Sequence, residues 1–313
     1  MPDRLEVIKT HKLFINGQFP RSESGRSLLV KDADGAVAAH ACMASRKDLR
    51  DAVVAARAAQ DGWTKRSAYN RGQILYRMAE MMEGKRAEFV DVLNDARAGS
   101  APGTRAKSAA GKRTTRPAPK SPTPSPDAEV TASIDRLVAF AGWADKFSQV
   151  LGCHNGVNGP YYNFTVAEAT GVVGVVAPDS PGLLALVSLM APAVCSGNTV
   201  VAISGEHAPL AACVLGEVCG TSDVPAGVVN ILTGSRQELI PHLAEHREVD
   251  AIVAANMPQH AAEALRLGSA NNLKRVLVRN IDPEAWYHPD ACESPWWIEP
   301  TVEMKTIWHP SSA

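Results

Sequence analysis

The second half of the chain alternates short, uninterrupted runs of hydrophobic residues with helix-length segments. Strands buried on both faces have this pattern, and they belong to a parallel sheet that is covered by helices on each side. The pattern therefore predicts an α/β fold, a Rossmann-like doubly wound parallel sheet over residues 171–280. Its predicted strands are residues 172–177, 199–203, 228–232, 250–254 and 275–278.

The first half of the chain has the periodicity of amphipathic helices instead. Ser45 and Asp48 resemble a capping box, which predicts a helix from this point to about Gly62. A longer helix is predicted over 68–93, and another one after residue 129. Residues 1–95 and 129–170 are therefore assigned to an N-terminal helical part with an oligomerisation hairpin.

A tight turn and two strands are also predicted outside the parallel sheet. Asn16-Gly17 lies between apolar residues, which is a strong hairpin signal. Residues 159–166 alternate like a strand, and residues 301–308 alternate like an exposed or edge strand. Such a terminal strand either pairs with another chain or folds back on its own domain, and the pattern alone leaves both open.

The composition changes sharply between the two helical regions. Residues 96–126 are rich in Ala, Gly, Ser, Thr and Pro, and they carry seven basic side chains and no acidic one. This segment has too little apolar surface to offset the entropy that is lost when a chain becomes ordered. Residues 96–128 are therefore predicted to be a disordered basic linker. A solvated tether is favoured over a nucleic-acid tether, because no aromatic residues interleave with the charges.

The whole-chain composition is that of an ordinary globular protein. The 313 residues are 45% hydrophobic and 21% charged, with a formal net charge of −1, which gives no bulk attraction to nucleic acid or an anionic membrane. No apolar stretch reaches the roughly 18 residues of a membrane span, and residues 1–11 lack the apolar core of a secretory signal. A cytoplasmic protein is expected. The six cysteines form no C-x-x-C pair and no zinc-site spacing, so no metal is expected.

Several segments together resemble the aldehyde dehydrogenase family. The resemblance lies in F-I-N-G-Q-F near the N-terminus, in the two helices that follow, and in A-G-W-A-D-K at 141–146. It continues through residues 162–178 and N-N-L-K-R-V at 271–276, and the tail T-V-E-M-K-T-I-W resembles the family's C-terminal oligomerisation strand. A-P-A-V-C-S-G-N-T-V-V at 191–201 and V-P-A-G-V-V-N-I-L-T-G at 224–234 are the most specific segments. Only 96–128 and roughly 281–295 lie outside the resemblance.

The resemblance implies a Rossmann-like cofactor domain, a catalytic domain, and a β-arm that reaches across to another subunit. It also implies oxidation of an aldehyde with NAD or NADP, in which a thiolate attacks the carbonyl and a glutamate activates water. Residues 281–313 are read as a remnant segment followed by the oligomerisation strand. The residues expected to mediate oligomerisation are Tyr162, Phe164, Val166, Val302, Met304, Ile307 and Trp308.

The family's catalytic residues are replaced at the positions that match its motifs. Ser180 takes the place of the oxyanion asparagine, and loss of such a donor costs about 2.7–4 kcal/mol of transition-state stabilisation. Arg279 takes the place of the general-base glutamate, and a guanidinium cannot act as a base at neutral pH. Only about twenty residues stand between Arg279 and Thr301, where the catalytic domain is expected. Cys292 in this interval lacks the family's surrounding motif, so no catalytic residue is expected.

The family's cofactor-binding motifs are also altered. Glu206 is retained near the expected adenosine ribose, but Ile203 replaces the lysine of the same motif. The glycine-containing segment on the pyrophosphate side has become residues 256–261, N-M-P-Q-H-A, which removes the close backbone approach that glycine permits. No bound cofactor is expected. The alternative is residual NAD(P) binding through Glu206.

Three functions follow from these residues. The favoured hypothesis is a non-catalytic subunit that assembles through its β-arm with a full-length, active aldehyde dehydrogenase, or with itself. The first alternative is an NAD(P)-binding regulatory module. The second is a residual NAD(P)-dependent aldehyde oxidoreductase that uses Cys292 or Cys195, although Cys195 lies in a helix-to-strand segment where a packing role is expected.

Overall fold

The computed structural model describes residues 7–32, 35–99 and 124–311. A five-stranded sheet forms the centre of the molecule, and all of its strand pairs are parallel. The strand order is β10-β9-β6-β7-β8, so the order reverses between β6 and β9. This confirms the predicted doubly wound sheet. The strands are β6 (Val172–Val176), β7 (Thr199–Ile203), β8 (Val229–Leu232), β9 (Ala251–Ala255) and β10 (Arg275–Arg279).

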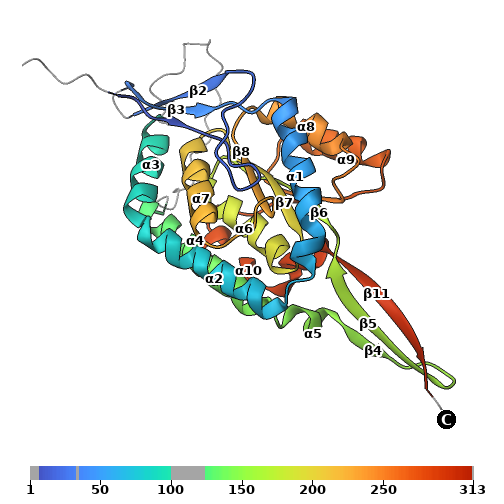
Figure 1. Cartoon of the computed structure of the whole chain (residues 1–313). Helices are drawn as coiled ribbons and strands as arrows, with labels where there is room; N and C mark the ends of the chain where they lie inside the picture. Colours follow the sequence, from blue (N-terminus) through green and yellow to red (C-terminus); the bar gives the residue numbers. More distant parts are fainter. Residues whose placement is uncertain (1–6, 33–34, 100–123, 312–313) are drawn as a thin grey trace, which may run out of the picture.

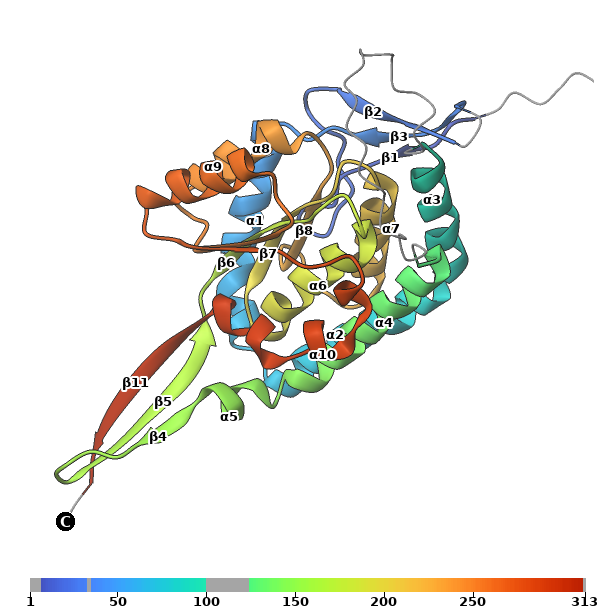
Figure 2. The same cartoon turned by 180° about the vertical axis from the view of Figure 1, so that it is seen from behind.

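Helices cover both faces of this sheet, and each face has its own hydrophobic core (Figures 1 and 2). On one face lie α6 (Gly182–Cys195) and α7 (Pro209–Thr221), with α2 (Ala68–Gly84), α3 (Arg86–Gly99) and α4 (Pro126–Trp143) outside them. On the other face lie α1 (Arg46–Thr64), α8 (Arg236–Glu245) and α9 (Gln259–Ala270). The strands are apolar on both sides because both sides are buried.

Two helix boundaries differ from those expected. The capping box of Ser45 and Asp48 is present at the start of α1, but the helix continues past Gly62 to Thr64. The reason is tertiary packing, because Trp63 is buried and its indole nitrogen donates to the Val194 carbonyl over 3.1 Å. The single helix expected over 68–93 is two helices, α2 and α3, which meet at Lys85.

The ends of the predicted basic linker are helical. Helix α3 continues to Gly99, and α4 begins at Pro126, where the Ser125 side chain accepts from the Ala128 amide. Residues 100–123, the rest of that prediction, lie outside the described residues.

A small N-terminal sheet lies beside the central sheet (Figure 1). It consists of β1 (Thr10–His11), β2 (Ser27–Lys31) and β3 (Val37–Cys42), in the order β1-β3-β2. The predicted Asn16-Gly17 turn follows β1, and both residues have positive φ angles of 53° and 71°. Phe14 beside this turn forms a bridge with Ile231, so the turn packs against β8, the edge strand of the central sheet.

A three-stranded antiparallel arm projects from the body of the molecule (Figures 1 and 2). It contains β4 (Cys153–Asn155), β5 (Tyr161–Ala169) and β11 (Val302–Pro310), and the short helix α5 (Phe147–Leu151) precedes it. Strand β11 pairs with β5 over its whole length. Of the two outcomes left open by the sequence, the tail folds back onto its own chain, and within the described residues it forms an edge of the arm.

Residues 280–301 connect β10 to β11 as a series of short helical turns, called the bridging segment here. The turns are η2 (Ala285–Tyr287), α10 (Pro289–Cys292), η3 (Pro295–Trp297) and η4 (Glu299–Thr301). Trp286, Trp297 and Ile298 are buried, and they belong to the same core as α4 and α6. The bridging segment is therefore a packed part of the body.

Candidate functional site

Three charged side chains meet at the carboxyl edge of the central sheet, where open α/β sheets bind their ligands. Asp179 follows β6, Glu206 follows β7, and Arg236 opens α8. One Asp179 oxygen accepts from the Glu206 amide over 2.7 Å, and the other accepts from the Arg236 guanidinium over 2.5 Å. Glu206 in turn accepts from the Arg236 amide over 2.7 Å. The three residues therefore form a closed ring of charge-assisted hydrogen bonds.

The hydrogen bonds of this ring limit how Glu206 can contact a ligand. The Arg236 side chain is only 15% exposed and also donates to the Ala177 carbonyl over 3.0 Å, so it is held firmly at the sheet edge. Glu206, the predicted ribose-binding residue, already accepts a hydrogen bond from its own chain. The charge of Asp179 is paired with that of Arg236.

The loop after β9, expected on the pyrophosphate side of a cofactor, is tied to the bridging segment. Asn256 has a φ of 50°, and its side chain exchanges two hydrogen bonds with the backbone of Ile281, of 2.8 and 3.0 Å. Met257 is half-buried against the core that α1, α8 and α9 share. Glu206 already accepts a hydrogen bond from within the chain, and the loop after β9 is tied to the bridging segment, so both positions expected near a dinucleotide make contacts within the chain itself.

A carboxylate from the chain itself occupies the N-terminus of α6. Glu129 on α4 is almost fully buried, and one of its oxygens accepts from the amides of Leu183 and Leu184 over 2.9 and 3.4 Å. Its other oxygen accepts from Arg97 over 3.0 Å. A helix N-terminus attracts anions, and here the anion is internal. This role could not be predicted from the sequence, because Glu129 has the position of an ordinary acidic residue in the first turn of α4.

The two altered catalytic positions lie in different surroundings. Ser180 is exposed in the turn before Pro181, and the peptide bond between them is cis. Arg279, at the end of β10, donates to the Trp296 carbonyl over 2.9 Å and lies 4.5 Å from the centroid of the Trp297 ring. Burial lowers the pKa of Arg279, but nearby acidic groups oppose that shift. The guanidinium that replaces the base is thus a structural contact to the bridging segment.

The candidate nucleophiles are inaccessible thiols. Cys292 is fully buried, its sulfur donates to the Ala285 carbonyl over 3.4 Å, and burial raises its pKa. Cys195 is also fully buried, and burial raises its pKa to about 12. Because the thiolate is the reactive form, neither cysteine is suited to attack a carbonyl.

Arg136 holds the bridging segment against α6, and sequence reasoning did not identify it. Its guanidinium is 1% exposed and donates to the Ser188 hydroxyl over 2.5 Å and to the Trp286 carbonyl over 2.9 Å. It also forms a 3.3 Å ion pair with Glu293. An arginine among the apolar positions of an amphipathic helix was the available signal, since a buried charge needs partners. These contacts cover the α6 side of the sheet with residues of the bridging segment.

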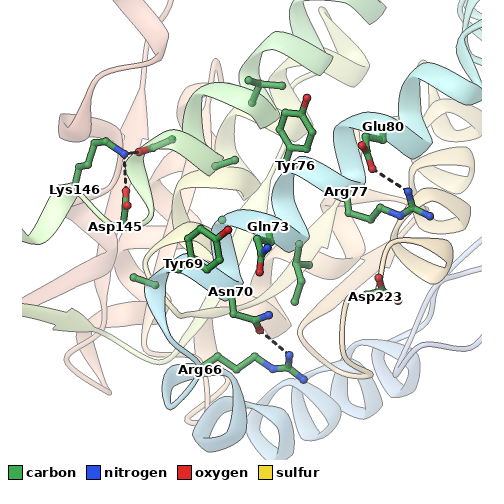
Figure 3. Close-up of a pocket in the computed structure, with 16 residues that line it drawn as sticks. Arg66, Tyr69, Asn70, Gln73, Tyr76, Arg77, Glu80, Asp145, Lys146 and Asp223 are labelled. Carbon is green, nitrogen blue, oxygen red and sulfur yellow. Dashed lines mark hydrogen bonds and ion pairs between the residues drawn. The ribbon is translucent and has the colours of Figure 1, made fainter.

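A surface groove between α2 and α4 has a volume of about 730 Å³ (Figure 3). Tyr69 and Tyr76 project into it from positions about two turns apart on α2, and both are more than half exposed. Its charged residues are mostly paired within the groove, as in Arg77–Glu80 at 2.9 Å and Lys146–Asp145 at 2.6 Å. None of its lining residues is Cys, Ser or His.

The residues expected to mediate oligomerisation all lie on the arm or at its base. Tyr162, Ile307 and Trp308 are exposed along the two long strands, and Met304 is 44% exposed. Phe164 and Val166 are half-buried, and Val302 is buried where the arm joins the body. The described residues contain no cluster of His, Cys, Asp or Glu that could hold a metal ion. Within the described part of the chain, no helix is long and apolar enough to cross a membrane.

Comparisons with known proteins agree on one family. The model described as "Aldehyde dehydrogenase family" matches residues 19–110 and 120–279, and so extends into both flanks of the predicted linker. Retinal dehydrogenase 2 of Mus musculus is 32% identical over 277 residues, which cover 87% of this chain and 48% of that protein. Cytosolic 10-formyltetrahydrofolate dehydrogenase of Xenopus laevis is 28% identical over 270 residues, which cover 85% of this chain and 28% of that protein.

Solved structures show the same fold at lower sequence identity. The NAD⁺ complex of an aldehyde dehydrogenase from Bacillus cereus has a TM-score of 0.71 and 22% identity, over 87% of this chain and 51% of that chain. Lactaldehyde dehydrogenase of Escherichia coli has a TM-score of 0.73 and 20% identity, over 87% of this chain and 52% of that chain. The chain thus spans about half the length of most of the relatives it matches.

Proposed function

The chain belongs to the aldehyde dehydrogenase family, and from that membership we propose that it is a non-catalytic subunit, which assembles through its arm with a catalytically active, full-length family member. Proteins of this family are commonly oligomeric and normally bind NAD or NADP. The observation that carries the proposal is the combination of a packed bridging segment with a retained arm. The interval expected to hold the catalytic domain is residues 280–301, and β11 follows it.

The state of the catalytic positions supports this proposal. Arg279 is held by the Trp296 carbonyl and the Trp297 ring, so the position of the general base has become part of the fold. Cys292 and Cys195 are buried thiols with raised pKa values. With these two thiols buried and a guanidinium at the expected base position, the residues described at these positions do not supply the nucleophile and the base that acyl transfer to water requires.

The retained arm supports assembly. An arm strand with exposed Ile307 and Trp308 contributes little to the core of its own chain, because it projects away from the body (Figure 2). Exposed aromatic side chains on an edge strand are typical of interaction surfaces. The partner would be a full-length aldehyde dehydrogenase chain, and a second copy of this chain is the alternative.

The experiment is affinity purification of the tagged chain from its own host, followed by native mass spectrometry. We expect a complex of fixed stoichiometry with a full-length aldehyde dehydrogenase. Aldehyde oxidation by that enzyme is then measured with and without this chain. A homo-oligomer that contains no such enzyme would contradict the proposal.

A nucleotide-binding regulatory module is the second candidate, and the intact parallel sheet with Glu206 at its carboxyl edge favours it. The ring of Asp179, Glu206 and Arg236 opposes it, because the ribose-binding carboxylate is already engaged. Calorimetric titration with NAD and NADP separates the two proposals. The subunit proposal expects no binding heat up to millimolar nucleotide, whereas saturable heat would favour the module.

Residual aldehyde oxidation is the third candidate, and it depends on one of the two buried thiols. Turnover of the purified chain with a panel of aldehydes, lost in Cys292→Ala, would support it. The expected result is no turnover above that of a protein-free control.

A further inference from the structure

The two edges of the central sheet differ in how they are covered. At one edge, the backbone of Phe14 exchanges hydrogen bonds of 3.1 and 2.7 Å with that of Ile231 on β8, so a segment of the chain itself covers this edge. At the other edge lies β10, which pairs with β9 alone in the described ranges of the chain. An edge strand presents a row of unpaired backbone donors and acceptors, onto which another strand can add.

The register identifies the free backbone groups of β10. The Arg275 amide donates to the chain just before β9 over 3.3 Å, and the Arg279 carbonyl accepts from the chain just after β9 over 2.8 Å. Because the hydrogen bonds of successive residues point alternately to the two sides of a strand, Val276 and Val278 direct their amides and carbonyls away from β9. Among the residues that the structure places, none forms a hydrogen bond with these groups.

The side chains of β10 determine the charge of this edge. The strand reads R-V-L-V-R, so Arg275, Leu277 and Arg279 share one side of the sheet and the two valines share the other. Arg275 is 47% exposed, and its ion pair with Glu303 is long, at 3.8 Å. Arg279 contacts a carbonyl and an aromatic ring, and it forms no ion pair with a carboxylate of the described residues. Positive charge therefore lies at both ends of the open edge.

We propose that β10 binds an extended acidic segment of another protein, which joins the central sheet as an additional strand. The backbone groups of Val276 and Val278 supply the main-chain hydrogen bonds. Segment residues opposite Arg275 and Arg279 are acidic, and the residue opposite Leu277 is apolar, since pairs of opposite charge across strands are favourable. The order R-V-L-V-R is the same in both directions, so this spacing suits a parallel or an antiparallel segment. The proposal goes beyond the proposed function, because it concerns an edge of the body and not the arm.

A second copy of this chain does not fit the same edge well. Two β10 strands that pair antiparallel over their full length place Arg275 of each copy opposite Arg279 of the other. Like charges directly opposite each other are destabilising. Charge complementarity therefore favours an acidic segment over self-pairing.

Two fluorescein-labelled peptides test the proposal as a matched pair. One contains the core Glu-Thr-Leu-Thr-Glu and the other contains Lys-Thr-Leu-Thr-Lys, so they differ only in charge. Their affinity for the purified full chain is measured by fluorescence anisotropy. We expect the acidic peptide to bind at least about tenfold more tightly than the basic one. Equal affinities, or no saturable binding of the acidic peptide, would overturn the proposal.

Hydrogen exchange, resolved to single amides by NMR, shows where the acidic peptide binds. We expect slower exchange of the Val276 and Val278 amides in the complex. The Arg275 amide should change little, because it is already bonded within the sheet. Binding that leaves the two valine amides unprotected would contradict strand addition.

Arg275→Gln and Arg46→Gln are matched variants of the chain. Each removes one positive charge from an exposed arginine, the first on β10 and the second at the start of α1. The glutamine side chain can still donate to the Val302 carbonyl, which Arg275 contacts, and circular dichroism checks that both variants are folded. We expect about a threefold loss of affinity for the acidic peptide in Arg275→Gln and none in Arg46→Gln. Equal losses would assign binding to net charge alone and overturn the proposal.

Discussion

Arg279 stands where the resemblance implies the general-base glutamate, and its side chain makes structural contacts. The family's general base would need a free carboxylate at this position, whereas the guanidinium here contacts a carbonyl and an aromatic ring of the bridging segment. These contacts need a cation that also donates hydrogen bonds, and arginine supplies both. The replacement was visible in the sequence, but its contacts with Trp296 and Trp297 were not, because a motif does not show which distant segment packs against it.

Restoring the glutamate should therefore damage the fold and produce no activity. In Arg279→Glu, a carboxylate would face the Trp297 ring and the Trp296 carbonyl and could donate to neither. We expect a loss of about 1–3 kcal/mol in the free energy of unfolding, measured by urea denaturation. Arg279→Met, which keeps the apolar stem, should lose less. Equal losses in the two variants would show that the charge at this position is immaterial.

Lys274 gives a second prediction at the residue scale. Burial lowers its pKa to about 8, and the charge of Asp250 opposes this shift. Its ammonium donates to the carbonyls of Leu243 and His246 at the end of α8. The unfolded chain, with a lysine pKa of about 10.4, holds the proton over a range in which the folded chain has released it. This residue's contribution to stability therefore rises with pH between those two values.

The measurement is the difference in unfolding free energy between the original chain and Lys274→Met across pH 7 to 10.5. Other groups that titrate in this range, the buried thiols among them, cancel in the difference. We expect the difference to shift in favour of the original chain as the pH rises above about 8. A difference that stays constant over this range would contradict the lowered pKa.

At the scale of elements, the sequence predicted the segments whose structure is determined locally. The five strands of the central sheet are continuous apolar runs, so their positions could be identified without any partner. The end of α1 and the break at Lys85 could not be predicted in this way. Packing of Trp63 extends α1, and tertiary contacts determine the break between α2 and α3. The bridging segment has no strong periodicity, and its short turns are fixed by contacts with α4 and α6.

The contacts of Arg136 make a prediction about this element. Arg136→Met would leave the Trp286 carbonyl and the Ser188 hydroxyl without their donor. Breaking a buried charged contact costs about 3–5 kcal/mol, and we expect a loss in that range together with faster hydrogen exchange over residues 284–298. Glu293→Gln is the control, because Glu293 is 22% exposed and a glutamine can still accept from Arg136. Unchanged exchange in Arg136→Met would mean that apolar packing alone holds the segment.

At the scale of the whole molecule, residues of the chain itself cover both faces of the central sheet. Two cores cover the two faces of the sheet, and the bridging segment contributes Trp286, Trp297 and Ile298 to one of them. Internal carboxylates occupy the N-terminus of α6 and the sheet edge beside α8. The sequence predicted the loss of the catalytic groups, which stays a prediction. It could not indicate what replaced them, since Glu129 and Arg236 act across long separations in the chain.

The arm lies outside both cores, which leads to a prediction for the molecule as a whole. Removal of residues 303–313 deletes most of β11 but keeps the buried Val302 and the bridging segment. The body should remain folded, and its thermal midpoint should fall by no more than about 2–4 °C, which corresponds to about 1 kcal/mol for a chain of this size. Assembly with the aldehyde dehydrogenase should be lost, because most of the arm's edge strand β11 is gone. Calorimetry follows the thermal midpoint, and native mass spectrometry follows assembly.

A shortened chain that still assembles would place the interface on the body. The groove between α2 and α4, with its exposed Tyr69 and Tyr76, is then the surface to examine next.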